Sequence, residues 1–244
     1  MTKSPRTRRR GGASARRAAR APAALRTGLA PGARLAPDEE LAASGKGEGR
    51  TLIIACGALA REIFFLKKAH GREDVDLHCL PASWHNTPQF IVPGLRERIR
   101  QGRAEGYAHI FAAYADCGTG GAIDKMLAEE GVERLPGAHC YAFYSGAEAF
   151  MDTIEGDARS FFLTDYLVRH FDALIVRGMM LDAHPELIAD YFGNYEKLVY
   201  LAQSDDEELT RKAEDAARFL GLAFEHRFTG FGDLDIALKV QDSP

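Results

Sequence analysis

The chain has 244 residues, of which 46% are hydrophobic and 27% are charged, and its formal net charge at pH 7 is −4. This composition is typical of a globular protein with enough apolar residues for a sizeable core. Its best apolar runs, such as "TLIIACGALA", stop after about ten residues. A transmembrane helix needs about 18, so we expect no membrane span.

Charge is distributed unevenly along the chain. Residues 1–50 carry 12 Lys and Arg against 4 Asp and Glu, whereas residues 51–244 carry 19 against 31. The first segment is rich in Ala, Arg, Gly and Pro and has no periodicity, so we expect a disordered basic leader over 1–50 and a single domain over 51–244. Because that domain is acidic, we expect no nucleic-acid partner.

The four cysteines are not expected to form disulfides. No secretory signal with a compact apolar segment is present, and a domain of this size does not need covalent cross-links. We therefore predict reduced thiols and a cytoplasmic location.

Strands and helices are predicted from the apolar periodicity and the turn residues. Strands are expected at 50–57, 75–82, 107–115, 196–203 and 222–230, and helices at 58–71, 95–106, 122–131, 146–156, 159–179, 184–194, 204–221 and 231–240. For the helix at 204–221, Ser204 and Glu207 are expected to form a capping box. The alternation predicts an α/β fold with a three-layer, mostly parallel Rossmann-like sheet and helices on both faces.

Thiols and an imidazole follow successive predicted strands. Cys56 ends the first strand, His85 lies in the loop after the second, Cys117 follows the third, and Cys140 comes after the next connection. Because ligands of open α/β sheets bind at the carboxyl ends of the strands, we expect these four side chains to meet in one crevice.

Soft sulfur ligands with an imidazole favour zinc, and three cysteines that leave one iron free also suit an iron–sulfur cluster. We therefore expect a metal site of Cys56, Cys117, Cys140 and His85. The chain has no CxxC pair, so this prediction depends on topology alone, and buried free cysteine is common in cores. Cys79 is expected to be such a core residue.

Two other interpretations of the turn "DCGTGG" stay open. In one, Cys117 is a nucleophile at a helix N-terminus, with His85 or His139 as its base and the amides of the following glycines free to bind an oxyanion. In the other, Gly118, Thr119 and Gly120 cradle a phosphate or cofactor, although the pattern is neither GxGxxG nor a P-loop. Glu62, on the first helix, is a further candidate ligand or proton acceptor.

Six segments also carry a resemblance to a known family. In chain order they are "LIIACGALAREI", "LPASWHNTPQ", "DCGTGG", "HCYAFYSG", "FFLTDYLVRHF" and "YFGNYEKLVYL". Over about residues 51–240 the chain resembles domain-of-unknown-function family 1638, and the leader lies outside the match. The positions matching that family's CG, His-Asn, DCG and HC patterns are Cys56, His85, Cys117 and Cys140.

The resemblance implies a neighbourhood of corrinoid-dependent methyltransferases but no defined reaction. Our leading hypothesis is a metal- or iron–sulfur-binding protein acting in corrinoid or one-carbon methyl-group metabolism, with a corrinoid protein or a methyltransferase as partner. The first alternative is a metal-free binding module or corrinoid-protein partner, and the second is an enzyme with Cys117 as its nucleophile.

Overall fold

The computed structural model of the chain describes residues 47–146, 150 and 156–240. The regular elements, in chain order, are β1 (Thr51–Cys56), η2 (Gly57–Leu59), α1 (Ala60–Ala69), β2 (Val75–Leu80), η3 (Ala82–Asn86), η4 (Pro88–Phe90), α2 (Ile91–Ala104), β3 (His109–Ala113), α3 (Ala122–Glu130), β4 (Glu133–Arg134), α4 (Ala142–Ser145), β5 (Ser160–Thr164), α6 (Asp165–Arg169), the π-helix η5 (Asp172–Arg177), α7 (Leu187–Phe192), β6 (Lys197–Ala202), α8 (Glu207–Leu220), β7 (Ala223–Phe228) and α9 (Gly232–Val240).

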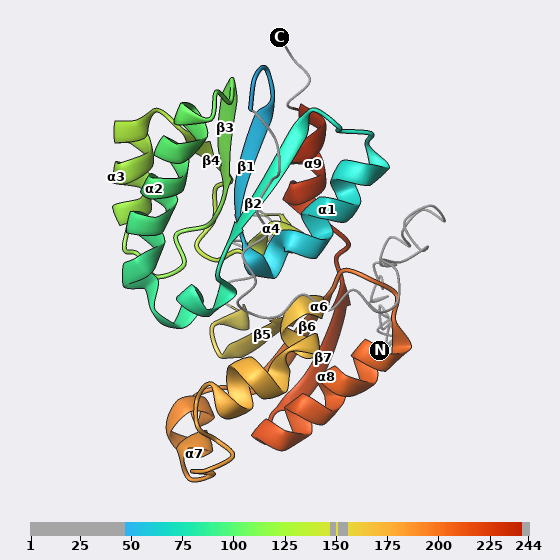
Figure 1. The fold of residues 1–244 in the computed structure, drawn as a ribbon. Helices are drawn as coiled ribbons and strands as arrows, with labels where there is room; N and C mark the ends of the chain where they lie inside the picture. Colours follow the sequence, from blue (N-terminus) through green and yellow to red (C-terminus); the bar gives the residue numbers. More distant parts are fainter. Residues whose placement is uncertain (1–46, 147–149, 151–155, 241–244) are drawn as a thin grey trace, which may run out of the picture.

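The first sheet has the strand order β2-β1-β3-β4, and all neighbouring strands are parallel. Helices α2 and α3 lie on one side of it, and α1 and α9 lie on the other (Figure 1). Because both faces are covered, every residue of the central strand β1 is buried, which explains its nearly continuous apolar sequence.

The second sheet has the order β5-β6-β7 and is also parallel. Helices α6 and α8 pack on it and on each other. After β7 the chain returns to the first sheet, where α9 packs on α1 and α4 (Figure 1). Leu234 and Leu238 of α9 belong to the core of the first sheet, and a hydrogen bond of 2.7 Å joins His70 Nε2 and Asp235 Oδ1.

The predicted α/β class, with parallel strands and helices on the faces, is confirmed, and the strands are divided between two sheets. The prediction of one helix over 159–179 is wrong at its start, because β5 occupies Ser160–Thr164 and pairs in register with β6. Thr164 then caps α6 by accepting a hydrogen bond from the Leu167 amide at 3.4 Å. The predicted helix at 146–156 lies mostly outside the described residues.

Helix α8 begins later than predicted. Asp206, rather than Ser204, is its N-cap, because Asp206 Oδ1 accepts hydrogen bonds from the amides of Glu208 at 2.9 Å and Leu209 at 3.1 Å. The preceding Ser204 hydroxyl donates to Asp165 instead. A carboxylate is the better cap here because it also complements the helix dipole.

The boundary of the predicted leader also moves. Residues 47–50 belong to the fold, because the Gly47 amide donates to the Glu105 carbonyl at 3.0 Å and Glu48 forms a β-bridge with Tyr107. The Arg50 guanidinium adds a bidentate contact with the Asp76 carboxylate, with Nε–Oδ2 and Nη2–Oδ1 distances of 2.7 and 2.6 Å. Residues 1–46 lie outside the described part, so the disorder expected there stays a prediction.

Candidate functional site

The predicted thiol and imidazole residues come from four connections at one end of the first sheet. Cys56 is the last residue of β1, His85 lies in η3 after β2, and Cys117 lies in the turn after β3. Cys140 comes two residues before α4. The helices that follow β1 and β3 cover opposite faces of the sheet. The carboxyl ends of these two strands therefore lie at the topological switch point, where α/β proteins bind ligands.

The three cysteines of this end lie together and are buried. The Sγ atoms of Cys117 and Cys140 are 3.3 Å apart, and both residues have free thiols. The Cys56 thiol is hydrogen-bonded to the Cys140 thiol, which lowers the pKa of Cys56. Cys79 is buried in the core, as predicted, and burial raises its pKa.

The hydrogen bonds around Cys117 favour its thiolate form. They lower its pKa to about 3, the Cys140 thiol contributing most, followed by the imidazoles of His139 and His85. The pKa of His85 is raised, chiefly by its hydrogen bond to Cys117. The pKa of Cys140 is raised, first by Cys117 and then by Cys56. The hydrogen bonds therefore favour the thiolate form of Cys117 and the neutral thiol form of Cys140.

The backbone of Cys117 explains how it reaches Cys140. Its φ of 46° lies in the left-handed region, which is uncommon for a residue with a side chain. Its amide donates to the Ala138 carbonyl at 2.8 Å, and the Asp116 amide donates to the Gly137 carbonyl at 3.1 Å. These bonds join the turn after β3 to the segment that carries Cys140.

The glycine loop after Cys117 is bonded to its own aspartate. The Asp116 carboxylate accepts hydrogen bonds from the Thr119 hydroxyl at 2.7 Å and from the amides of Gly120 at 3.1 Å and Gly121 at 2.7 Å. A phosphate held by Gly118, Thr119 and Gly120 would have to displace this carboxylate. That cofactor site stays a prediction.

Part of the sequence argument for a Cys117 nucleophile was wrong. Helix α3 begins at Ala122, with Gly121 as its N-cap, so Cys117 is not at a helix N-terminus. The amides of Gly120 and Gly121 are not free for an oxyanion, because Asp116 occupies them. The thiolate is stabilised by side chains of other connections instead.

A pocket of about 280 Å³ opens beside the thiols. Cys56, His85, His139 and Cys140 form its thiol end, and the other lining residues come from η2, η3, α4, β5, α6 and η5 and from the loops that hold Tyr141 and Tyr195. Cys117 is not among the lining residues, so it adjoins the pocket through its hydrogen-bonded neighbours. The site therefore lies where the two sheets meet.

Glu62 lies in a different electrostatic setting from the thiols. It is 1% exposed, and its pKa is raised to about 7, first by burial and then by Asp165. Its Oε2 atom has no hydrogen-bond partner among the described residues. Glu62 is not one of the residues lining the pocket, and its role as ligand or proton acceptor stays a prediction.

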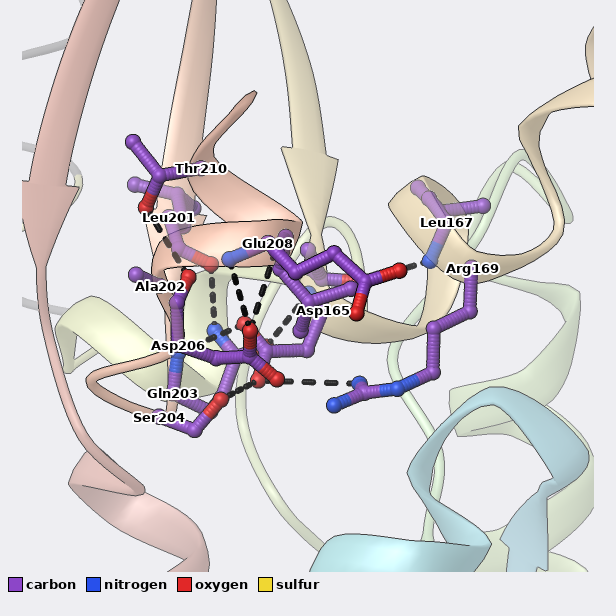
Figure 2. A network of polar contacts seen from close by, with 12 residues as sticks. Asp165, Leu167, Arg169, Leu201, Ala202, Gln203, Ser204, Asp206, Glu208 and Thr210 are labelled. Atoms are coloured by element: carbon purple, nitrogen blue, oxygen red, sulfur yellow. Dashed lines mark hydrogen bonds and ion pairs between the residues drawn. The ribbon is translucent and has the colours of Figure 1, made fainter. Parts of the chain in front are cut away.

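Asp165 forms a second buried polar group, shown in Figure 2. Its Oδ1 accepts hydrogen bonds from the Tyr200 hydroxyl at 2.7 Å and the Gln203 amide at 3.0 Å. Its Oδ2 accepts one from the Ser204 hydroxyl and lies 3.6 Å from Arg169 Nη1. This network fixes the end of β6 relative to α6.

Sequence reasoning missed several tyrosines of the site, among them Tyr114 and Tyr144. Tyr114 is hydrogen-bonded to Cys56, and Tyr144 lines the pocket. The available signal for Tyr144 was its spacing of four residues from Cys140, which places both on one side of a helical turn. Tyr114 follows a strand, where nothing in its spacing separates a site residue from a core residue.

The side chains do not stand in a ready coordination geometry. In the part of the chain that is described, no group of three or more His, Cys, Asp or Glu residues is placed to hold a metal ion as it stands. The donor set of three thiols and an imidazole nevertheless has the chemistry of zinc ligands.

Comparison with known proteins identifies one relationship. A protein-family model described as "Protein of unknown function (DUF1638)" matches residues 79–238. Searches of curated proteins and of solved structures gave no significant match. Among the described residues, no helix is both long and apolar enough to span a bilayer.

Proposed function

The chain belongs to the DUF1638 family, and we propose that it binds a metal ion through Cys56, Cys117 and Cys140, with His85 as fourth ligand or proton donor. The 3.3 Å separation of the Cys117 and Cys140 sulfurs carries this proposal. Two thiolates on one tetrahedral zinc, with Zn–S of about 2.3 Å, lie about 3.8 Å apart. Opening the pair by a few tenths of an ångström therefore admits the ion.

The same separation favours one ion over a 4Fe–4S cluster, in which each cysteine binds a different iron. Rotation of the Cys56 and His85 side chains would complete the ligand set, since no three groups are aligned as they stand. With the three cysteines as its only protein ligands, zinc would keep one open position and would supply a Lewis acid that can hold a substrate thiol as its thiolate. His85 would orient the substrate thiol or exchange a proton with it.

The wider role proposed from the family resemblance is in corrinoid or one-carbon methyl-group metabolism, with a corrinoid protein or a methyltransferase as partner. A thiolate-bound zinc suits activation of a thiol that accepts a methyl group. Four free, buried thiols also suit a reducing compartment, and we propose the cytoplasm.

Metal analysis of the full chain, purified without oxygen, tests the proposal. We expect about one equivalent of zinc per chain, falling at least tenfold in Cys140→Ala because a thiolate ligand is lost. Cys79→Ala is the matched control: it also removes a buried thiol, but not a proposed ligand, and should keep the metal. Circular dichroism would verify that both variants fold.

If the metal analysis finds iron together with labile sulfide, the proposal of a zinc ion would be replaced by that of an iron–sulfur cluster bound to the same residues. If the wild-type protein contains neither zinc nor iron, and all four thiols react with a thiol reagent in the native state, metal binding is refuted. The metal-free binding module, our first alternative, would then be the better proposal.

The lowered pKa of Cys117 favours a second candidate function, in which this thiolate is a nucleophile. In metal-free protein at pH 7, iodoacetamide should modify Cys117 at least tenfold faster than Cys79, because only the thiolate reacts. Peptide mass spectrometry would give the rate at each cysteine. Equal rates at both positions would exclude the nucleophile.

A further inference from the structure

The pocket beside the thiols has the size and walls of a small-molecule site. A closed apolar cavity of about 150 Å³ holds benzene, so a volume of about 280 Å³ has room for an aromatic ring with a short substituent. Six aromatic side chains line it: Tyr141, Tyr144, Phe161, Phe162, Tyr166 and Tyr195.

Some of these aromatic side chains are held in place by stacking, in part between the connection that carries Cys140 and strand β5 of the second sheet. The Tyr141 ring stacks on His139, with centroids 5.0 Å apart, and on Phe162 of β5, with centroids 5.2 Å apart. Such rings are placed before any ligand arrives, and a pre-formed apolar site binds without a large ordering cost.

Apart from tyrosine hydroxyls, the ionisable groups that line the pocket are confined to its thiol end, where the pKa of His85 is raised by its hydrogen bond to Cys117. None of its lining residues, all within the described part of the chain, is an Asp, Glu, Lys or Arg. An ionised ligand group buried among the aromatic rings would lose its hydration without gaining a counter-charge, which is costly. The lining therefore selects an uncharged molecule.

Two residues that line the pocket each have a polar atom without a hydrogen-bond partner among the described residues. Tyr144 is 1% exposed, and its hydroxyl has no hydrogen-bond partner among the described residues. His139, which also lines the pocket, has an unpartnered Nδ1 atom. Buried polar atoms are normally paired, so a ligand with one hydrogen-bonding group would satisfy what the protein leaves unpaired.

We propose that this pocket binds a small, uncharged organic molecule with an aromatic or apolar body and a single hydroxyl or thiol group that bonds to Tyr144. The hydroxyl or thiol group of the ligand lies toward the thiol end of the pocket, and its aromatic or apolar body lies among the aromatic rings. Neither Tyr144 nor Ile175, another lining residue in η5, is a proposed metal ligand. Binding is therefore expected with or without a bound metal.

Titration of the full chain with benzyl alcohol and with toluene, followed by ligand-observed NMR, tests this. We expect both to bind, and Tyr144→Phe to weaken benzyl alcohol about five- to tenfold while leaving toluene unchanged, because only the alcohol loses a hydrogen bond. Ile175→Trp, which fills the pocket, should abolish binding of both. Ile236→Trp, at a position 57% exposed, is the matched control and should change neither.

Phenylacetate and benzyltrimethylammonium test the charge preference, and both should bind at least tenfold more weakly than benzyl alcohol. Tighter binding of the ammonium would overturn the uncharged class in favour of a cation held by the aromatic faces. Equal binding of benzyl alcohol to the wild type and Ile175→Trp would overturn the location. No detectable binding of either neutral probe would overturn the site.

Discussion

Replacing Asp165 with Ala is expected to lower the free energy of unfolding by about 3–5 kcal/mol. Asp165 is 1% exposed, and its carboxylate accepts a hydrogen bond from the Tyr200 hydroxyl. It also accepts hydrogen bonds from the Gln203 amide and the Ser204 hydroxyl, beside the Arg169 guanidinium (Figure 2). Removing it leaves two buried donors without an acceptor and Arg169 without its counter-charge. Unpaired buried groups of this kind cost far more than the bonds contribute when made.

Urea unfolding followed by circular dichroism measures this loss. Asp172→Ala is the matched control, because Asp172 also pairs with an arginine, Arg177, but its side chain is 67% exposed. Surface pairs contribute little, so the control should change stability by less than about 0.5 kcal/mol. A similar small change in Asp165→Ala would show that water reaches the network and replaces the carboxylate.

Stability should depend on pH through Glu62. Its pKa rises from 4.5 to about 7 in the folded state, so the folded protein binds this proton more tightly than the unfolded chain. The resulting stabilisation is fully present below pH 4.5 and is lost as pH rises through about 7. At about 1.4 kcal/mol per pKa unit, the loss is about 3 kcal/mol.

Glu62→Gln removes the titrating group while keeping its shape. Unfolding free energies measured from pH 4.5 to 8 should fall by about 3 kcal/mol more in the wild type than in this variant. Other groups titrate in both proteins and cancel in the difference. The exposed Glu73 offers the control, because Glu73→Gln makes the same chemical change at the surface and should alter the free energy of unfolding by less than about 0.5 kcal/mol. Parallel profiles for Glu62→Gln and the wild type would contradict a protonated, buried Glu62.

The sequence was sufficient to place the thiols at one end of a parallel sheet. Cys56 ends a strand, His85 and Cys117 each follow one, and parallel topology brings the carboxyl ends of strands together whatever the side-chain details. The 3.3 Å approach of Cys117 to Cys140 was not predictable. It depends on the left-handed backbone of Cys117 and on bonds to Gly137 and Ala138, which no pattern of residue types encodes.

The second sheet was the harder part of the fold to predict. Strand β5 is five residues long and runs directly into α6, so "SFFLT" and the following helix give one continuous apolar pattern. Only its pairing with β6, about 37 residues later, separates strand from helix. The pocket was unpredictable for the same reason, because Phe162 reaches the thiol end only once β5 is in place.

The path of α9 sets the order in which the chain can complete its structure. Phe231, Leu234 and Leu238 close the core over α1, where Phe231 stacks on Phe65 with centroids 5.3 Å apart. These residues are synthesised after the whole second sheet. The core of the first sheet therefore cannot be completed until the second sheet has been synthesised. Its apolar surface stays exposed on the nascent chain until Leu238 emerges.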